Sequence, residues 1–106
     1  MTFQELGLNS DLMKAVTDLG FTSPTPIQQQ TIPLLAKQKT DLVALAQTGT
    51  GKTAAFGLPI LNNIDLNDRT VQALVLAPTR ELCVQITNDI KNYSKYLKNF
   101  GVTAIY

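Results

Sequence analysis

The chain has 106 residues, 44% hydrophobic and 16% charged, which excludes a disordered tail or a coiled coil and predicts one small globular domain or part of a larger one. Nine basic and eight acidic residues give a net charge of +1, so any contact with nucleic acid must come from locally placed charge. No apolar run approaches the roughly 20 residues of a membrane span, and the single Cys83 cannot form an internal disulfide, which predicts a cytoplasmic protein.

The first third of the chain predicts two helices. Apolar residues recur at helical spacing over residues 8–19, and Asn9 or Ser10 can cap that helix. A second helix is expected over residues 26–36, after two prolines that fix an extended entry. Because proline removes a hydrogen-bond donor from a helix interior, we expect a bend or break at Pro33.

A strand, a glycine-punctuated loop and a helix follow in the order that a phosphate site needs. Residues 42–46 are apolar without alternation, which is typical of a strand buried on both faces of a parallel sheet. A helix is expected over residues 53–63. Between them runs a segment close to the Walker A pattern GxxxxGK[ST], with alanine at its first position: Ala46, Gln47, Thr48, Gly49, Thr50, Gly51, Lys52 and Thr53.

This loop has the chemistry to hold a triphosphate and magnesium. Gly49 and Gly51 allow consecutive backbone N–H groups to turn toward a phosphate, and the helix that follows adds the positive end of its dipole. Lys52 can reach the outer phosphates, and the Thr53 hydroxyl can ligate a bridging magnesium ion. The alternative is a glycine-rich and threonine-rich turn with a solvated lysine.

The second half of the chain repeats the alternation of strand and helix. Residues 71–77 predict a strand that Pro78 stops. Thr79 is a good N-cap for a helix whose apolar stripe runs from Leu82 to Leu97 and ends before Gly101. Residues 102–106 predict a third strand, so the element order indicates an α/β fold with a parallel sheet.

In such a sheet both strand-to-helix junctions, residues 47–53 and 78–80, lie at the carboxyl edge where ligands collect. The second junction adds the guanidinium of Arg80, which suggests a second anion site for a nucleic-acid backbone. A surface arginine paired with a nearby carboxylate is the alternative.

Three segments in this order resemble the motifs of one family. Phe3, with the Gly-Phe and Pro-Thr-Pro-Ile-Gln of residues 20–28, resembles the Q motif of DEAD-box RNA helicases. Residues 46–53 resemble their motif I, and residues 78–82 resemble their motif Ia. The resemblance implies a P-loop NTPase fold, namely an incomplete first RecA-like helicase domain.

The resemblance also implies roles for single residues. Gln28 would read adenine with its amide, and Phe3 would stack on the base; a solvated Gln28 and a core Phe3 are the alternatives. ATP and magnesium would be the cofactors, with Lys52 and Thr53 as catalytic residues. RNA would be held by its backbone without sequence reading, by Pro78, Thr79 and Arg80.

Two regions are predicted, a Q-motif helical region (residues 1–36) and a partial ATP-binding domain (residues 37–106). The resemblance implies that the parent protein unwinds short RNA duplexes. The DEAD sequence itself does not occur in these residues, so we expect the 106-residue chain to be catalytically inactive. Alternatives are a binding module without catalysis, another P-loop ATPase such as a DNA helicase, and a chain that is not stably folded alone. Nothing in the sequence names a protein partner.

Overall fold

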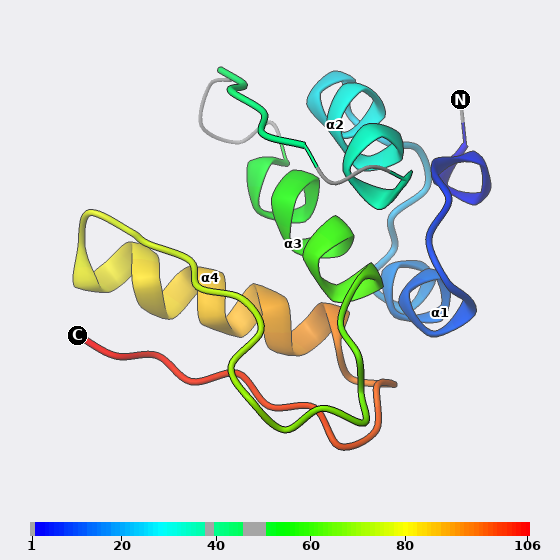
Figure 1. The fold of residues 1–106 in the computed structure, drawn as a ribbon. Coiled ribbons are helices and arrows are strands. Elements are labelled where there is room, and N and C mark those ends of the chain that lie inside the picture. Colours follow the sequence, from blue (N-terminus) through cyan, green and yellow to red (C-terminus); the bar gives the residue numbers. More distant parts are fainter. Residues whose placement is uncertain (1, 38–39, 46–50) are drawn as a thin grey trace.

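The structure, a computed structural model, describes residues 2–37, 40–45 and 51–106 (Figure 1). The elements in these ranges are the 3₁₀-helix η1 (Phe3–Leu6) and the α-helices α1 (Ser10–Asp18), α2 (Pro26–Lys37), α3 (Lys52–Asn62) and α4 (Arg80–Tyr93). None of the helices in the described ranges is both long and apolar enough to reach across a bilayer.

Helix α1 begins and ends with the signals that its sequence carries. The Asn9 side chain accepts a hydrogen bond from the Leu12 N–H at 3.0 Å, which confirms one of the two predicted N-caps. Gly20 follows the helix at a φ of +82°, and the Phe21 N–H donates to the Val16 carbonyl at 3.0 Å. This is the left-handed ending that glycine favours.

Two helices run through an internal proline. Of the bend or break predicted at Pro33, the break is wrong, because α2 continues to Lys37. The bend stays a prediction. Helix α3 likewise contains Pro59. Helix α2 packs chiefly against α3, and Thr31 and Ile32 on its inner side are buried. We attribute the intact helix to this burial, since tertiary packing commonly outweighs the loss of one backbone hydrogen bond.

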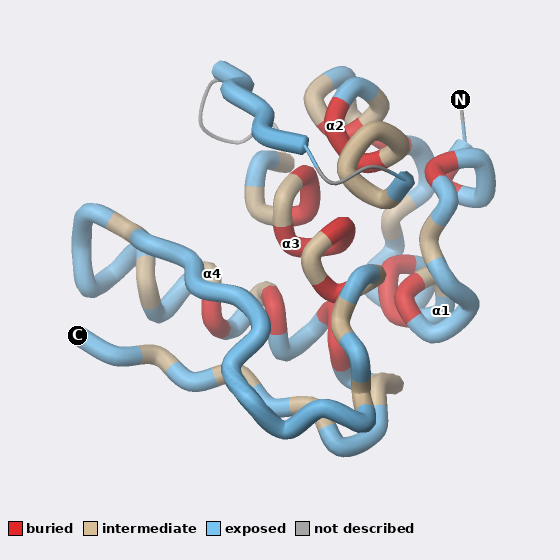
Figure 2. The backbone as a smooth tube through the Cα atoms, viewed as in Figure 1, coloured by how far each residue is buried: buried red, intermediate tan, exposed pale blue. Residues whose placement is uncertain are grey.

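One apolar core joins the two predicted regions. Figure 2 shows buried residues on α1, α2, α3 and the later turns of α4. Residues from both of the predicted regions contribute to this core. The boundary predicted at residue 36 stays a prediction. The core consists of Phe3, Leu6, Leu12, Val16, Ile32, Ala54, Leu58, Leu61, Ile90 and Tyr93.

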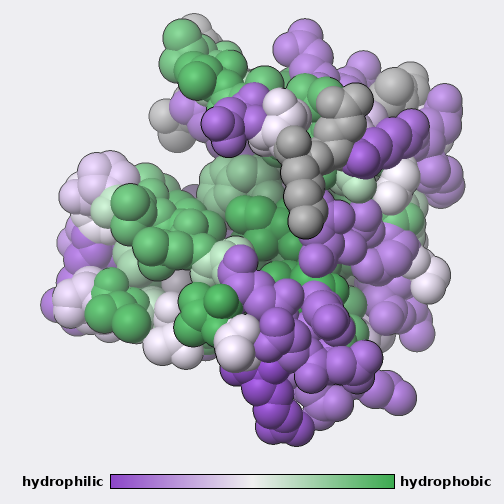
Figure 3. Space-filling view, viewed as in Figure 1, coloured by the Kyte–Doolittle hydropathy of each residue, from purple (hydrophilic) through white to green (hydrophobic). Residues whose placement is uncertain are grey.

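The predicted parallel sheet is not formed in the part of the chain that the structure describes. Residues 42–45, 71–77 and 102–106 carry no strand assignment there. Their side chains are largely exposed: Val71 is 90% exposed and Ile105 86%. Figure 3, viewed from the same side as Figure 1, shows apolar residues exposed at the surface. The shared sheet edge expected for the two anion sites is therefore absent from these ranges.

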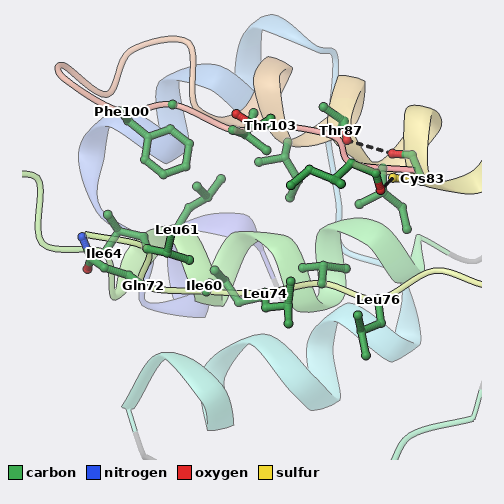
Figure 4. Close-up of a pocket in the computed structure, with 18 of the residues that line it drawn as sticks. Ile60, Leu61, Ile64, Gln72, Leu74, Leu76, Cys83, Thr87, Phe100 and Thr103 are labelled. Carbon is green, nitrogen blue, oxygen red and sulfur yellow. Dashed lines mark hydrogen bonds between the residues drawn. The ribbon is translucent and has the colours of Figure 1, made fainter. Parts of the chain in front are cut away.

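An open cavity of about 960 Å³ lies between two of these segments. Leu74 and Leu76 line one side of it beside α3, while Phe100 and Thr103 line the opposite side beside α4 (Figure 4). Paired strands must lie about 4.8 Å apart. Because the cavity separates these two segments, their backbones cannot bond to each other, although their apolar patterns suit a buried sheet.

Helix α4 is shorter than its apolar stripe predicts. It begins at the predicted cap, where the Thr79 hydroxyl oxygen accepts from the Leu82 N–H at 3.1 Å. It ends at Tyr93, so the prediction that it continues through Leu97 to Gly101 is wrong. The Ser94 N–H still donates to the Ile90 carbonyl at 2.9 Å, and the Ser94 hydroxyl donates to the same carbonyl at 2.7 Å.

A polar cluster fastens the segment after α4 to α1. The Tyr96 hydroxyl donates to the Asp18 carboxylate, and Lys95 Nζ lies 3.1 Å from the same carboxylate. Lys14 Nζ lies 4.5 Å from the Tyr96 ring centroid. The hydrogen bond from Tyr96, followed by that from Lys95, holds the pKa of Asp18 below its ordinary value of 3.8.

We expect this cluster to stabilise the fold in a pH-dependent way. A carboxylate whose folded pKa is lowered adds stability above its ordinary pKa, and that stability is lost as the pH falls through the lowered value. Thermal melts should show that Asp18→Asn is less stable than wild type at neutral pH and that the difference shrinks in acid. Tyr96→Phe should follow the same trend with a smaller effect. If the difference in melting temperature between wild type and Asp18→Asn were the same at neutral and acid pH, this role would be contradicted.

Candidate nucleotide site

The site predicted for phosphate lies at the beginning of α3. Gly51 is the N-cap at a φ of +82°, and Lys52 and Thr53 form the first turn, with Lys52 exposed and Thr53 half-buried. The first turn of a helix leaves backbone N–H groups without partners in the helix, so this end suits an anion. The remaining residues predicted for this loop, Ala46, Gln47, Thr48, Gly49 and Thr50, lie outside the described residues.

Gln28 is held at the beginning of α2 by a reciprocal cap. Its Oε1 accepts from the Thr25 N–H at 3.0 Å, while the Thr25 hydroxyl oxygen accepts from the Gln28 N–H at 3.4 Å. This is a capping box, whose sequence signature is threonine followed three residues later by glutamine. A cap at Thr25 and a helix that begins at Pro26 are predicted from the sequence and confirmed here, whereas the return bond from Gln28 was missed, although its signature was readable.

The Gln28 amide also reaches the phosphate site. Its Nε2 donates to the Gly51 carbonyl at 3.3 Å, and the whole residue is only 4% exposed. A Cβ at Gly51 would lie 2.3 Å from this Nε2 and 3.1 Å from the Thr25 hydroxyl oxygen. The first turn of α2 and the N-cap of α3 are thus in direct contact through a glycine that leaves room for the amide. The solvated Gln28 considered as an alternative is not what the structure shows.

The bonds among the described residues use only part of the hydrogen-bonding capacity of the Gln28 amide. A carboxamide has two acceptor lone pairs and two N–H donors. The contacts with Thr25 and Gly51 use one lone pair and one donor. One lone pair and one N–H donor of the amide are therefore not used by these two contacts.

The donor set at this end of α3 also fits magnesium and a triphosphate. The Lys52 ammonium is exposed at the helix N-terminus, where it can meet an anion. The hydroxyl of Thr53 is a hard oxygen ligand of the kind that magnesium takes. Residues that fit the group are therefore present in the first turn.

Phe3 lies in the core. It is 3% exposed, and its ring centroid lies 5.8 Å from that of Phe21, which in turn lies 6.1 Å from that of Tyr93. The core position considered as an alternative is where the structure places it. Stacking of Phe3 on adenine stays a prediction, and the amide contacts of Gln28 do not depend on it.

The second predicted site lies at the beginning of α4. Pro78, Thr79 and Arg80 are exposed there. The Arg80 guanidinium carbon lies 4.5 Å from the ring centroid of Tyr106, and among the described residues it has no carboxylate partner. The stacking on Tyr106 could not be predicted, because nothing in the spacing of these two residues indicates proximity. The guanidinium lies over the ring of Tyr106, which is the arrangement of a cation–π contact.

Comparison with known proteins decides the family. A sequence model described as DEAD/DEAH box helicase matches residues 25–106, more than half of the chain. The chain belongs to this family. The DEAD-box assignment made from the Q motif and motifs I and Ia is thereby confirmed.

Curated DEAD-box relatives match this chain over almost its full 106 residues. It is 50% identical over 105 residues to ATP-dependent RNA helicase DeaD of Klebsiella pneumoniae, covering 99% of the chain and 16% of that protein. It is 54% identical over 105 residues to DEAD-box ATP-dependent RNA helicase CshA of Geobacillus kaustophilus, covering 99% of the chain and 22% of that protein. The chain thus spans about a fifth of the length of these curated relatives.

Solved DEAD-box structures share its fold. S. cerevisiae Dbp5 bound to RNA and ADP BeF3 superposes with a TM-score of 0.88 at 39% identity, covering 92% of this chain and 25% of that one. A DEAD box protein from the hyperthermophile Methanococcus jannaschii gives a TM-score of 0.83 at 39% identity, with coverages of 88% and 25%. The fold is therefore part of a RecA-like DEAD-box domain, although its described residues form helices only.

Proposed function

We propose that this chain is the ATP-binding portion of an ATP-dependent RNA helicase of the DEAD-box type. The observation that carries the proposal is the hydrogen bond from Gln28 Nε2 to the Gly51 carbonyl. It puts an amide able to recognise adenine beside the helix end that suits a triphosphate. DeaD and CshA, which carry the name ATP-dependent RNA helicase, support the assignment.

Each residue of the site has a distinct part in nucleotide binding. The first-turn amides of α3 and the Lys52 ammonium bind and orient the outer phosphates, and residues 46–50 are proposed to bind ATP with them. Thr53 holds magnesium, which neutralises developing charge on the phosphates when bound. Gln28 selects adenine over guanine, because guanine presents an acceptor where adenine presents its amino group.

RNA binding is proposed for residues 78–80. The Thr79 oxygen is an acceptor in the helix cap, which leaves its hydroxyl proton to donate to a phosphate. The Arg80 guanidinium, stacked on Tyr106, adds positive charge at the same helix end. Such contacts position a strand without reading its sequence, and Dbp5 was solved with both RNA and a nucleotide analogue.

We infer a cytoplasmic location and no membrane partner. The support is the single Cys83, which suits a reducing compartment, and the bacterial origin of DeaD and CshA. No protein partner is proposed.

The test is RNA-stimulated ATP hydrolysis by the protein expressed from its complete gene. We expect ATP turnover that RNA stimulates more than DNA of the same length, and strand separation of short RNA duplexes. The purified 106-residue chain should turn over no ATP, since it holds only the Lys52 part of the transition-state charge. Equal stimulation by DNA, or turnover by the 106-residue chain, would refute the proposal.

A further inference from the structure

Pro59 leaves a carbonyl inside α3 without its regular donor. In an α-helix the N–H of each residue bonds to the carbonyl four residues earlier, and proline has no N–H. The carbonyl affected by Pro59 is that of Ala55, in the first turn of the helix that begins at Lys52. Ala55 and Pro59 are both buried, so water is a poor substitute.

The missing donor comes from the neighbouring helix. The Thr31 hydroxyl, on a residue only 4% exposed, lies 3.2 Å from the Ala55 carbonyl oxygen and 2.8 Å from the Ile27 carbonyl oxygen. The Ile27 carbonyl already has a donor in the backbone N–H of Thr31, four residues on in α2. The hydroxyl proton is therefore needed at Ala55, where no other regular donor exists.

This contact repeats the Gln28 contact one turn farther along both helices. Gln28 and Thr31 are three residues apart on one face of α2, and their partners Gly51 and Ala55 are four apart on α3. Two hydrogen bonds thus fix the register of α2 against the beginning of α3. The two helices are neighbours in Figure 1.

We propose that Thr31 is a positioning residue of the nucleotide site: by donating to the carbonyl that Pro59 leaves without a partner, it locks α2 to α3 and holds Gln28 beside the phosphate site. This role rests on the nucleotide site proposed above. Thr31 touches no nucleotide in it and acts through Gln28. The carbonyl that needs the Thr31 hydroxyl exists because of Pro59, which lies twenty-eight positions after Thr31 in the sequence.

A double-mutant cycle of unfolding tests the hydrogen bond. Thr31→Val keeps the shape and removes the hydroxyl, and Pro59→Ala restores a backbone N–H to the Ala55 carbonyl. In wild type, Thr31→Val should lower the folding equilibrium constant about tenfold, because a buried carbonyl loses its donor. In the Pro59→Ala background the loss should be several times smaller. Equal losses in both backgrounds would overturn the link to Pro59.

Nucleotide titration of the protein from its complete gene tests the positioning role, below the melting temperature of each variant. Thr31→Val should reduce the preference for ATP over GTP about tenfold, and Thr31→Ser, which keeps the hydroxyl, should restore it. If Thr31→Val is poorly folded, the Pro59→Ala background provides a folded host, in which Thr31→Val should still reduce the preference, because the hydrogen bond between α2 and α3 is lost there too.

The controls separate this inference from the proposed function. An unchanged preference in Thr31→Val, while Gln28→Ala loses it, would overturn the positioning role alone. If Lys52→Ala and Gln28→Ala also leave ATP binding unchanged, the nucleotide site itself is refuted and the role of Thr31 falls with it.

Discussion

Replacing Gly51 by alanine is expected to lower the free energy of unfolding by about 2–4 kcal/mol, combining left-handed strain with lost hydrogen bonds. The backbone at Gly51 has a φ of +82°, which alanine adopts only with strain. The new Cβ would lie 2.3 Å from Gln28 Nε2, so the amide must move away from the Gly51 carbonyl. Chemical denaturation measures the loss of stability. The displacement of the Gln28 amide is measured as a loss of preference for ATP over GTP.

Gly20 offers a matched control for this substitution. It has the same φ of +82°, but a Cβ there would meet nothing within 4 Å. Gly20→Ala should therefore cost only the left-handed strain, about 1–2 kcal/mol, and leave nucleotide preference unchanged. If Gly51→Ala cost no more than Gly20→Ala, close contact between Gln28 and Gly51 would not be important for the fold.

Replacing Lys52 by alanine is expected to weaken ATP binding about 10- to 100-fold, the effect of losing a charge-assisted hydrogen bond. Lys52 is exposed in the first turn of α3, so the melting temperature should hardly change. The loss should be larger for ATP than for ADP, because the ammonium is proposed to meet the outer phosphates. Calorimetric titration of both nucleotides measures the difference.

Lys91, an exposed lysine in the last turn of α4, is the matched control for charge alone. Lys91→Ala removes the same charge far along the chain from the phosphate loop and should leave both affinities unchanged. Equal weakening by the two substitutions would indicate a general electrostatic effect, and equal weakening of ATP and ADP by Lys52→Ala would contradict its placement at the outer phosphates.

Local signals predicted the helix beginnings well. Asn9 and Thr79 cap α1 and α4 with their side chains, as their residue types indicate, because a cap depends on contacts within three residues. Lys52 begins α3 beside the glycine that the loop pattern requires. The family assignment rested on the same kind of local signal and was confirmed.

Features that depend on distant partners were not predictable. The apolar segments at 71–77 and 102–106 have the composition of buried strands, but a strand exists only when another backbone lies beside it, and a cavity separates these two. The continuity of α2 through Pro33 accompanies the burial of Thr31 and Ile32 where α2 packs against α3. In each case a contact outside the local pattern decided the structure.

The most direct measurement of the central claim is a side-by-side titration of the protein from its complete gene with ATP and GTP, in wild type and in Gln28→Ala. We predict that wild type binds ATP at least about tenfold more tightly than GTP, and that Gln28→Ala removes this preference. Equal affinity of wild type for the two nucleotides would contradict the assignment of Gln28 as the adenine-reading residue of a triphosphate site.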